Sequence, residues 1–527
     1  MSSFIAAMTR RMPLKTAVSE KTDLDRCLGL TDVVFMLVGK IVGAGILTVL
    51  GVAAHTAGPA VVLSFIVASI AALFSAVCYC EFVSRSPAAG GAYVYVYSQC
   101  GEFLGYVVGW LLLFDYGVTA AALSRAWSGY FVVFVNAVTP ADWSVPKYLI
   151  SYPFTVVGIP LDLNILTVII LIILAVPTLT GVRGSSATTA VVTCAKLFAL
   201  LIATVFAFAY ANEDNWKNEE NGGFAPHGVT GIMRAAVMVF FAYIGFDAVC
   251  TVAEEVKEPR WILPYGILLS LLICSIIYVT VASAMTLMVP AHELDDTAPV
   301  AAAFDGQPHG HIIKIIVAGG ATIGLTAGVI VSIMAQARIW FALARDGLVL
   351  EWFGRVHPTF QTPFNATCVT VFAACFMGGL VPFGVLADMI SCGTLTALTL
   401  VCVALLVMRY GGPTGQLSFI IGYVVLATTA MYVPTPINFL LGGGAASVGV
   451  GLIFIPDQTK FDGEDVFRVP FGPVLPCCGI AFNMYLMSFL ASSWTWIGCW
   501  LIVGLASYFG YGMWNSRCQP EGQALRQ

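Results

Sequence analysis

Two glycine-containing segments, about two hundred residues apart, carry the clearest chemical signal in this sequence. They occupy residues 39–45 and 241–247, and each lies within a long apolar run. Glycine weakens a helix, and irregular backbone inside a membrane occurs only where it lines a cavity or is buried in protein. Paired glycine-interrupted spans in the two halves of a chain therefore predict a ligand site at mid-depth in an inverted-repeat transporter.

The backbone groups freed by the two breaks suggest which ligand would fit. Amides freed by the first break form a helix N-terminus that attracts an anion such as an α-carboxylate, and they belong to Gly43, Ala44 and Gly45. Freed carbonyls accept hydrogen bonds from an α-ammonium, and they belong to Ile41, Phe241, Ala242 and Ile244. Together they predict an amino acid zwitterion as the ligand. Close helix packing is the alternative, because small-xxx-small spacing is common in membrane bundles.

Three ionisable residues fall at mid-span: Lys40, Asp115 and Lys196. Burying a charge in the membrane is costly, so such residues are candidates for a functional role. Asp115 has three open roles, which are pairing with a buried cation, carrying a proton and attracting the side chain of a substrate. Lys196 lies about 14 Å from the predicted helix end, at 1.5 Å per residue, so snorkelling is its alternative role. Because two nearby ammonium groups repel, we expect Lys40 or Lys196 to be neutral or to pair with Asp115.

The elements that position these residues are predicted to be membrane-spanning helices. The 527 residues are 59% hydrophobic and only 10% charged, with a mean hydropathy of +0.89. A spanning helix needs about 20 apolar residues. The first ten predicted spans are 31–49, 60–82, 103–131, 163–176, 187–210, 232–252, 265–288, 312–343, 367–381 and 385–408. The last four are 417–432, 437–454, 475–490 and 495–511, which makes about fourteen.

The distribution of basic residues predicts the orientation. With both termini inside, only Lys147, Lys217, Arg234 and Lys314 fall on the outer side, and most other basic residues outside the spans fall on the inner side. This is a positive-inside bias. We therefore expect a multi-pass protein with cytosolic termini, in the plasma membrane.

Several other classes of function are disfavoured. No segment concentrates enough Lys and Arg for a nucleic-acid interface, and the fifteen cysteines show neither metal-ligand spacing nor a disulfide framework. A channel would need a continuous polar pore, and an enzyme would need a catalytic cluster. We expect no enzyme activity, metal or cofactor. The expected partners are the lipid bilayer and a small-molecule substrate, with protons left open.

Several ordered motifs make the chain similar to the cationic amino acid transporter family of the amino acid-polyamine-organocation superfamily. The resemblance runs from about Asp23 to Tyr511. The matching segments are residues 43–45, 78–82, 90–93, 109–110, 245–247, 254–256, 344–347, 393–395 and 469–471.

The resemblance implies a five-plus-five inverted-repeat core followed by four peripheral helices. The corresponding division of the chain is a tail at 1–27, a core at 28–410, peripheral helices at 411–515 and a second tail at 516–527. It also implies that Gly43, Ala44 and Gly45 bind the carboxylate of an amino acid. The amine would be bound by Phe241, Ala242 and Ile244. Phe246 would be an aromatic gate, with a core aromatic as the alternative.

Four positions bear on substrate and energetics. Ser332 aligns with the family position at which a small residue accompanies cationic substrates, which favours arginine or lysine. Lys196 matches a lysine that replaces sodium in bacterial relatives, which implies sodium independence. Lys40 departs from the small residue usual at its position, and Asp115 replaces the usual glutamate. A broad neutral amino acid permease and a polyamine carrier therefore stay as alternatives, and uniport, exchange and proton symport stay open.

Charged residues near the span ends have two explanations. They are Glu81 with Arg85, Glu254 with Glu255, and Arg338 and Arg345 with Asp346. Such pairs either latch an inner gate during alternating access or are ordinary solvated helix ends.

Overall fold

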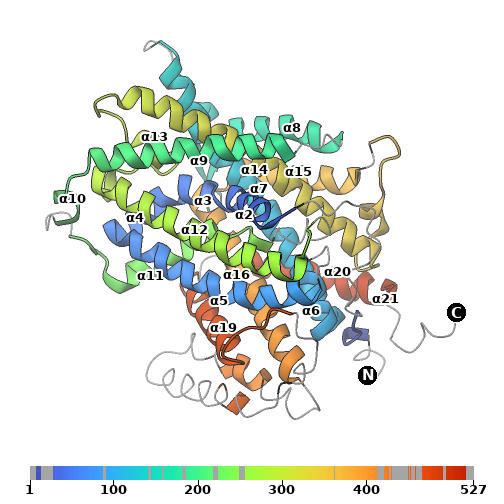
Figure 1. Ribbon diagram of the computed structural model, residues 1–527. Helices are drawn as coiled ribbons and strands as arrows, with labels where there is room; N and C mark the ends of the chain where they lie inside the picture. Colours follow the sequence, from blue (N-terminus) through green and yellow to red (C-terminus); the bar gives the residue numbers. More distant parts are fainter. Residues whose placement is uncertain are drawn as a thin grey trace.

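The computed structural model describes most of the chain. The described residues are 7–12, 28–86, 91–140, 144–156, 159–180, 186–217, 223–247, 256–360, 362–411, 420–426, 429, 449, 451–452, 457, 466–490 and 494–517. Within these ranges the chain is almost entirely helical, with one short β-hairpin (Figure 1).

The first half contains the following elements in chain order. They are α2 Leu30–Ile41, α3 Ala44–Leu47, α4 Val49–Ala57, η1 Gly58–Ala60, α5 Val61–Arg85, α6 Gly91–Cys100, α7 Glu102–Val138, η2 Lys147–Leu149, β1 Tyr152–Val156, β2 Ile159–Leu163, α8 Ile165–Leu179, α9 Ser186–Ala209, α10 Asp214–Lys217, α11 Gly228–Phe240 and η4 Phe241–Tyr243.

The second half continues with longer helices. They are α12 Pro259–Met288, η6 Ala291–Glu293, α13 Pro299–Ala302, α14 Gly310–Arg345, η7 Glu351–Gly354, α15 Phe364–Leu380, α16 Phe383–Tyr410, α19 Val474–Met487, α20 Trp494–Ser507, η8 Tyr508–Gly512 and α21 Met513–Asn515.

These helices follow the apolar runs of the sequence. Each of the first ten predicted spans, and each of the last two, contains one helix or a pair of helices. Within the described ranges, eight helices are long and apolar enough to cross a membrane, and four shorter apolar helices accompany them. The chain is thus an all-helical polytopic membrane protein. Half of predicted span 417–432 and most of predicted span 437–454 lie outside the described residues, so the count of fourteen stays a prediction.

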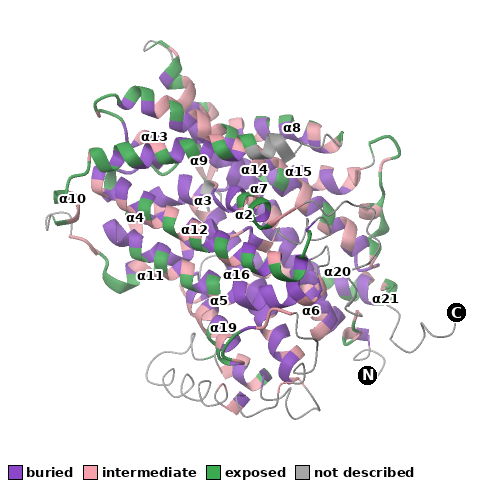
Figure 2. Ribbon diagram, in the orientation of Figure 1, coloured by how far each residue is buried: buried purple, intermediate pink, exposed green. Residues whose placement is uncertain are grey.

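The side chains on the outside of the bundle are those expected against lipid. Large apolar residues are exposed on several helices, among them Ile172 of α8, Phe198 of α9, Leu272 of α12 and Phe372 of α15. In Figure 2, exposed residues follow the outer sides of α9 and α12, whereas buried residues fill the interior. A ring of exposed apolar side chains matches a hydrocarbon environment.

The helices α7 and α14 form the centre of the bundle. They pack along each other, and α7 also contacts α6, α8, α15 and α16. Small residues permit this close approach: a side chain at Gly117 of α7 would collide with Gln336 of α14. The amide nitrogen of Gln336 donates a hydrogen bond to the Leu113 carbonyl of α7 at 2.8 Å. These two helices therefore form a close-packed framework for the site.

The hairpin is an addition to the predicted all-helical fold. Strands β1 and β2 pair antiparallel, with Tyr152 opposite Leu163 and Phe154 opposite Leu161. An ion pair between Asp162 of β2 and the buried Arg125 of α7, at 3.1 Å, fixes the hairpin against the bundle. Directly after β2, the side chain of Asn164 accepts a hydrogen bond from the Thr167 amide and caps α8.

Candidate functional site

Both predicted breaks are present as interruptions of helical backbone. Helix α2 ends at Ile41, Val42 has extended backbone, and a new helical turn starts at Ala44. After η4, Ile244 is extended and Gly245 has φ of +121°. Residues with a Cβ rarely adopt that conformation, which explains why glycine follows the second break.

The two breaks lie against each other in the middle of the bundle. A Cβ at Gly45 would collide with the backbone of Ala242, so a side chain there would push the breaks apart. The buried hydroxyl of Tyr278, on α12, lies 2.8 Å from the Ile41 carbonyl oxygen and 2.8 Å from the Ala242 carbonyl oxygen. Its single proton serves one acceptor at a time. Tyr278 thus holds together two segments about two hundred residues apart in sequence.

A cavity of about 320 Å³ lies where the breaks face α7, α9 and α14. Small-molecule sites usually occupy about 300–1,000 Å³, so this cavity suits a small ligand. The cavity lining includes most of the site residues that were predicted from the sequence. These are Lys40, Ile41, Gly43, Gly45, Asp115, Lys196, Phe241, Ile244 and Ser332. The lining also includes Met36 of α2, Val192 of α9 and Arg338 of α14, which place its far end toward the predicted cytosolic side.

Lys196 connects α9 to the helix before the first break. Its ammonium donates a hydrogen bond to the Gly39 carbonyl, and the side chain is buried. Gly39 has no room for a side chain because Thr193 of α9 occupies that space. A Cβ at Gly324 of α14 would lie 2.8 Å from the Lys196 Cδ. Lys196 is therefore packed between three elements of the site, and its ammonium does not snorkel to a helix end.

Asp115 places a carboxylate with an unused acceptor in the cavity wall. Its Oδ2 accepts a hydrogen bond from the Thr394 hydroxyl of α16 at 2.7 Å. Its Oδ1 is buried and has no hydrogen-bond partner among the described residues. A buried acceptor without a donor is costly, so this oxygen can accept a hydrogen bond from a ligand.

Lys40 lies beside both breaks and near two carboxylates. Its ammonium is 5.7 Å from the ring centroid of Tyr116, and its side chain would contact any Cβ at Gly245. The Tyr116 hydroxyl donates to Asp247 Oδ2 at 2.5 Å. Lys40 and Asp115 also interact electrostatically. The Lys40 ammonium therefore offsets part of the negative charge of the Asp115 carboxylate in the cavity.

Ser332 lies on the cavity wall, as its predicted role requires. Its hydroxyl donates to the Gly328 carbonyl of the same helix at 3.0 Å. The serine therefore provides space in the cavity, and its proton is already engaged within α14. Nearby glycines on this helix, Gly324 and Gly328, add further space to the lining.

Two other predicted site residues, Ala242 and Phe246, are not among the described lining residues. Ala242 is buried, and its carbonyl faces Tyr278. Phe246 is buried with its ring 5.8 Å from that of Tyr79, in an edge-to-face contact. Ala44 begins α3 directly after the break, and its side chain lies outside the described set.

Tyr278 and Tyr116 are the main site residues missing from the sequence prediction. Both lie in apolar spans and resemble ordinary core aromatics. Their hydroxyls pair with groups more than a hundred residues away, except for the Tyr278 contact with Ala242. The sequence does show that each tyrosine lies within a membrane span. Because a buried hydroxyl needs a hydrogen-bond partner, this placement indicates a polar contact inside the bundle.

Fold and site together define a class of protein. A polytopic helical bundle has a small cavity at mid-span, walled by interrupted helices and carrying a few fixed charges. This is how membrane carriers build substrate sites.

The comparisons with known proteins identify the family. Residues 28–461 match the amino acid permease family, and residues 467–516 match the C-terminus of the same family. The chain therefore belongs to the amino acid permease family, within the amino acid-polyamine-organocation superfamily, and is a transporter in class. The resemblance predicted from the motifs is confirmed.

Relatives with different named substrates align over nearly the whole chain. The methylthioribose transporter of Bacillus subtilis (strain 168) is 32% identical, covering 97% of this chain and 99% of that protein. Cationic amino acid transporter 4 of Mus musculus is 31% identical, covering 98% and 92%. The branched-chain amino acid permease BcaP of Bacillus subtilis is 32% identical, covering 96% and 97%.

Proposed function

We propose that this protein carries amino acids across a membrane by alternating access, without sodium, and that arginine and lysine are its preferred substrates. The observation that carries the proposal is the cavity at the two helix breaks, with Lys196 bonded to the Gly39 carbonyl beside it. The underlying architecture is a five-plus-five inverted repeat over residues 28–410, with peripheral helices at 411–515. Both termini lie in the cytosol, and the membrane is the plasma membrane.

The backbone of the two breaks binds the common part of the substrate. The amides of Gly43, Ala44 and Gly45 receive the carboxylate, and the carbonyls of the second break receive the amine. The Tyr278 hydroxyl already engages Ile41 and Ala242. The Phe241 carbonyl accepts from the Ile244 amide at 3.2 Å, so the Ile244 carbonyl in the cavity lining is the main acceptor for the amine.

The side chain of the substrate points toward Ser332 and Asp115. The unpartnered Oδ1 of Asp115 accepts a hydrogen bond from a guanidinium or ammonium group. Ser332 leaves the space that such a long side chain needs. A cationic substrate also gains about 2.3 kcal/mol per 100 mV of inside-negative potential, which drives uptake without another ion.

The absence of a sodium requirement follows from the place of Lys196. The Gly39 carbonyl would be an oxygen ligand for a cation bound between α2 and α9. The Lys196 ammonium occupies that oxygen as a hydrogen-bond donor. A second positive charge beside it would be repelled.

Alternating access is supported by the contacts on the outer side of the site. His55 Nε2, on α4, lies 2.8 Å from the Leu294 carbonyl oxygen near η6. The Tyr130 hydroxyl donates to the Leu47 carbonyl. These contacts close the outer side while the cavity extends toward Arg338, as in an inward-facing state. Phe246, packed on Tyr79, gates the cavity when its ring moves toward the second break.

Neutral amino acids are the second candidate class, and Lys40 is the observation that favours them. Its ammonium compensates part of the Asp115 charge. The rest of the lining is mostly apolar, with Met36, Leu123, Leu325 and Val331 among its residues. Such a wall suits an aliphatic side chain. A polyamine fits less well because it has no carboxylate for the amides of the first break.

Competition for uptake distinguishes these substrates. The purified protein is placed in liposomes, and uptake of labelled L-arginine is measured in choline medium and in sodium medium. We expect equal uptake in both media and competition by L-lysine. Weak competition by L-leucine and none by putrescine are expected as well. Strong uptake of labelled L-leucine that arginine does not inhibit would favour the neutral class, and uptake only in sodium medium would contradict the role of Lys196.

A further inference from the structure

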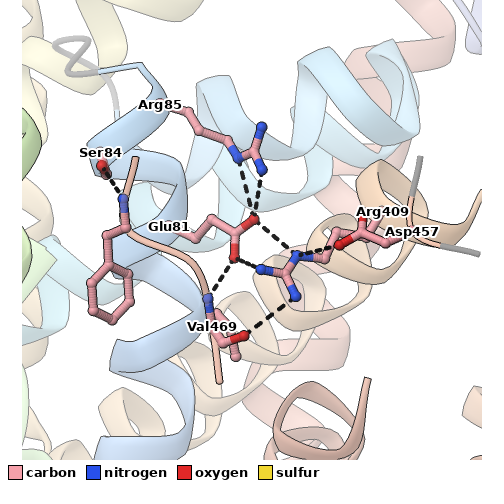
Figure 3. Close-up of polar contacts among 7 residues, drawn as sticks. Glu81, Ser84, Arg85, Arg409, Asp457 and Val469 are labelled. Carbon is pink, nitrogen blue, oxygen red and sulfur yellow. Dashed lines mark hydrogen bonds and ion pairs between the residues drawn. The ribbon is translucent and has the colours of Figure 1, made fainter. Parts of the chain in front are cut away.

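A second polar cluster lies away from the cavity, where α5 and α16 end side by side. Figure 3 shows its members, which we call the Glu81 junction: Glu81 and Arg85 of α5, Arg409 of α16, Asp457, and Val469. Val469 belongs to residues 466–470, the segment that precedes α19. The sequence allowed Glu81 to be a solvated helix end, but its side chain is fully buried.

The carboxylate of Glu81 is saturated with donors. Arg409 donates through Nε to Oε1 at 2.9 Å and through Nη2 to Oε2 at 2.5 Å. Arg85 donates to Oε1 from Nε at 3.2 Å and from Nη2 at 3.1 Å. The Val469 amide donates to Oε2 at 2.9 Å. One buried group thus connects two membrane helices and the segment before α19 (Figure 3).

Among the described members of the junction, the charges balance. Two guanidinium groups face two carboxylates, since Arg409 is also 3.9 Å from Asp457. Arg409 itself is 3% exposed, and its Nη1 lies 3.4 Å from the Val469 carbonyl oxygen. A buried ion pair of this kind is strongly destabilised when one partner leaves, because the other charge stays buried without compensation.

A neighbouring serine adds a fourth element to the junction. The Ser84 hydroxyl donates to the Arg260 carbonyl of α12 at 2.9 Å and accepts from the Phe467 amide at 2.9 Å. The ring of Phe467 also contacts that of Tyr265 on α12. Residues 466–470 are thus bonded to α5 and α16, and they contact α12 through the Phe467 ring.

We infer that α5, α12, α16 and residues 466–470 form one rigid unit that stays together while the transporter changes state, with Glu81 as its positioning residue. This inference rests on the proposed alternating access. Separating α5 from α16 would break several charge-assisted bonds in a dry site. Separating α9 from α2 at Lys196 breaks one hydrogen bond. The conformational change therefore occurs on the α2 and α9 side of the cavity.

The first test replaces the Glu81–Arg409 ion pair by neutral side chains, while Arg85 and Asp457 keep one charge of each sign in the junction. The variants are Arg409→Met, Glu81→Gln and the double variant, each measured for uptake per molecule at the cell surface. The single variant Arg409→Met leaves Arg85 as the described cation beside Glu81. Glu81→Gln leaves two guanidinium groups with Asp457 as the remaining described carboxylate. We expect each to lower the maximal rate at least tenfold, about 1.4 kcal/mol in equivalent free energy.

The double variant distinguishes a junction that stays intact during transport from a junction that must open and close. The glutamine introduced at position 81 still accepts from the Val469 amide, and the methionine introduced at position 409 fills the space of the arginine stem. Because a buried ion pair can be replaced by neutral groups of similar size at little cost, we expect the double variant to keep about a third or more of the wild-type maximal rate, with KM within about twofold. A double variant that reaches the surface but does not transport would overturn the inference. Each rate is expressed relative to wild type. It is measured with a labelled amino acid that the wild-type protein transports.

The second test does not depend on transport or on the altered junction. Spin labels are attached to ketone-bearing residues at the exposed positions Trp261 and Phe471, which leaves the fifteen native cysteines unlabelled. Distances are measured without amino acid and with saturating L-arginine or L-leucine. We expect one narrow Trp261–Phe471 distance in every condition. A second distance for this pair would overturn the inference. The pair Trp261–Val191, which joins α12 to exposed α9, is the matched control and is expected to change with the amino acid.

Discussion

The cavity at the helix breaks and the Glu81 junction are both polar sites in an apolar bundle, yet they are built in opposite ways. At the junction both oxygens of the buried carboxylate have donors, and the charges of its described members balance. In the cavity, within the part of the chain that the structure describes, Asp115 keeps an oxygen without a partner and Lys196 holds α9 to α2 through one hydrogen bond. Unsatisfied groups and single bonds suit a site that binds and moves. Saturated groups suit a site that holds its shape.

The largest effect on stability is expected at the junction. Replacing Arg409 by methionine leaves a buried carboxylate with less compensation, which costs about 3–5 kcal/mol for pairs of this kind. A thermal-unfolding measurement in detergent should show a clear loss of stability relative to wild type. Arg517→Met is the matched control, because Arg517 pairs with Glu351 where both side chains are more than half exposed. Equal melting temperatures for the two variants would mean that the junction is no more important than a surface pair.

A large effect on transport is expected at Lys196. Lys196→Met keeps the apolar stem but removes the donor to the Gly39 carbonyl. Because a hydrogen bond to a charged group contributes about 1.5–3 kcal/mol, uptake should fall roughly tenfold or more. Uptake is measured in sodium-free medium and divided by surface abundance. Lys217→Met, which removes an exposed lysine outside the bundle, should leave uptake unchanged. Uptake by Lys196→Met within twofold of wild type would show that transport does not need the Lys196 hydrogen bond to Gly39.

A selective effect is expected at Ser332. Ser332→Met fills the space in the cavity, and one methylene group in a pocket alters discrimination by about 1–3 kcal/mol. Arginine uptake should therefore fall about tenfold while alanine uptake stays within about threefold. Ser332→Ala keeps the space and should behave as wild type, because the serine hydroxyl is engaged by Gly328. Equal losses for arginine and alanine in the methionine variant would mean that Ser332 does not sense the side chain.

The smallest effect is expected at Lys40. Replacing this lysine should change the ratio of arginine to leucine uptake and so distinguish the cationic from the neutral class of substrate. Like charges in a partly solvated site interact by an energy on the order of 1 kcal/mol, so Lys40→Ser should raise the ratio of arginine to leucine uptake by about threefold or more. Lys40→Arg keeps the charge and should keep the ratio. The ratio is measured from initial rates of the two labelled amino acids. A lower ratio in Lys40→Ser would show that this lysine assists cationic substrates.

The sequence predicted the backbone of the cavity well because local composition determines it. Glycines in an apolar span mark a break wherever it lies, and both breaks occur at the predicted residues. Mid-span charges are rare enough that Lys40, Asp115 and Lys196 could be selected individually, and all three line one cavity.

Pairings across the fold were not predictable in the same way. Glu81 and Arg409 are 328 residues apart, and nothing local to either residue indicates the other. The hydroxyl of Tyr278 finds two carbonyls that are free only because two other segments are unwound. The hairpin at 152–163 was not predicted, because its two strands are only five residues long and lie between long apolar spans.

The central claim is that the transported amino acid binds where the two broken helices meet. Its most direct test is uptake by Gly45→Ala, because the added methyl group collides with Ala242 and forces the two breaks apart. Gly498→Ala is the matched control, since a methyl group there meets open space. At equal surface abundance, we predict that Gly45→Ala abolishes uptake of labelled L-arginine and L-leucine while Gly498→Ala transports as wild type. Wild-type uptake by Gly45→Ala would contradict the claim.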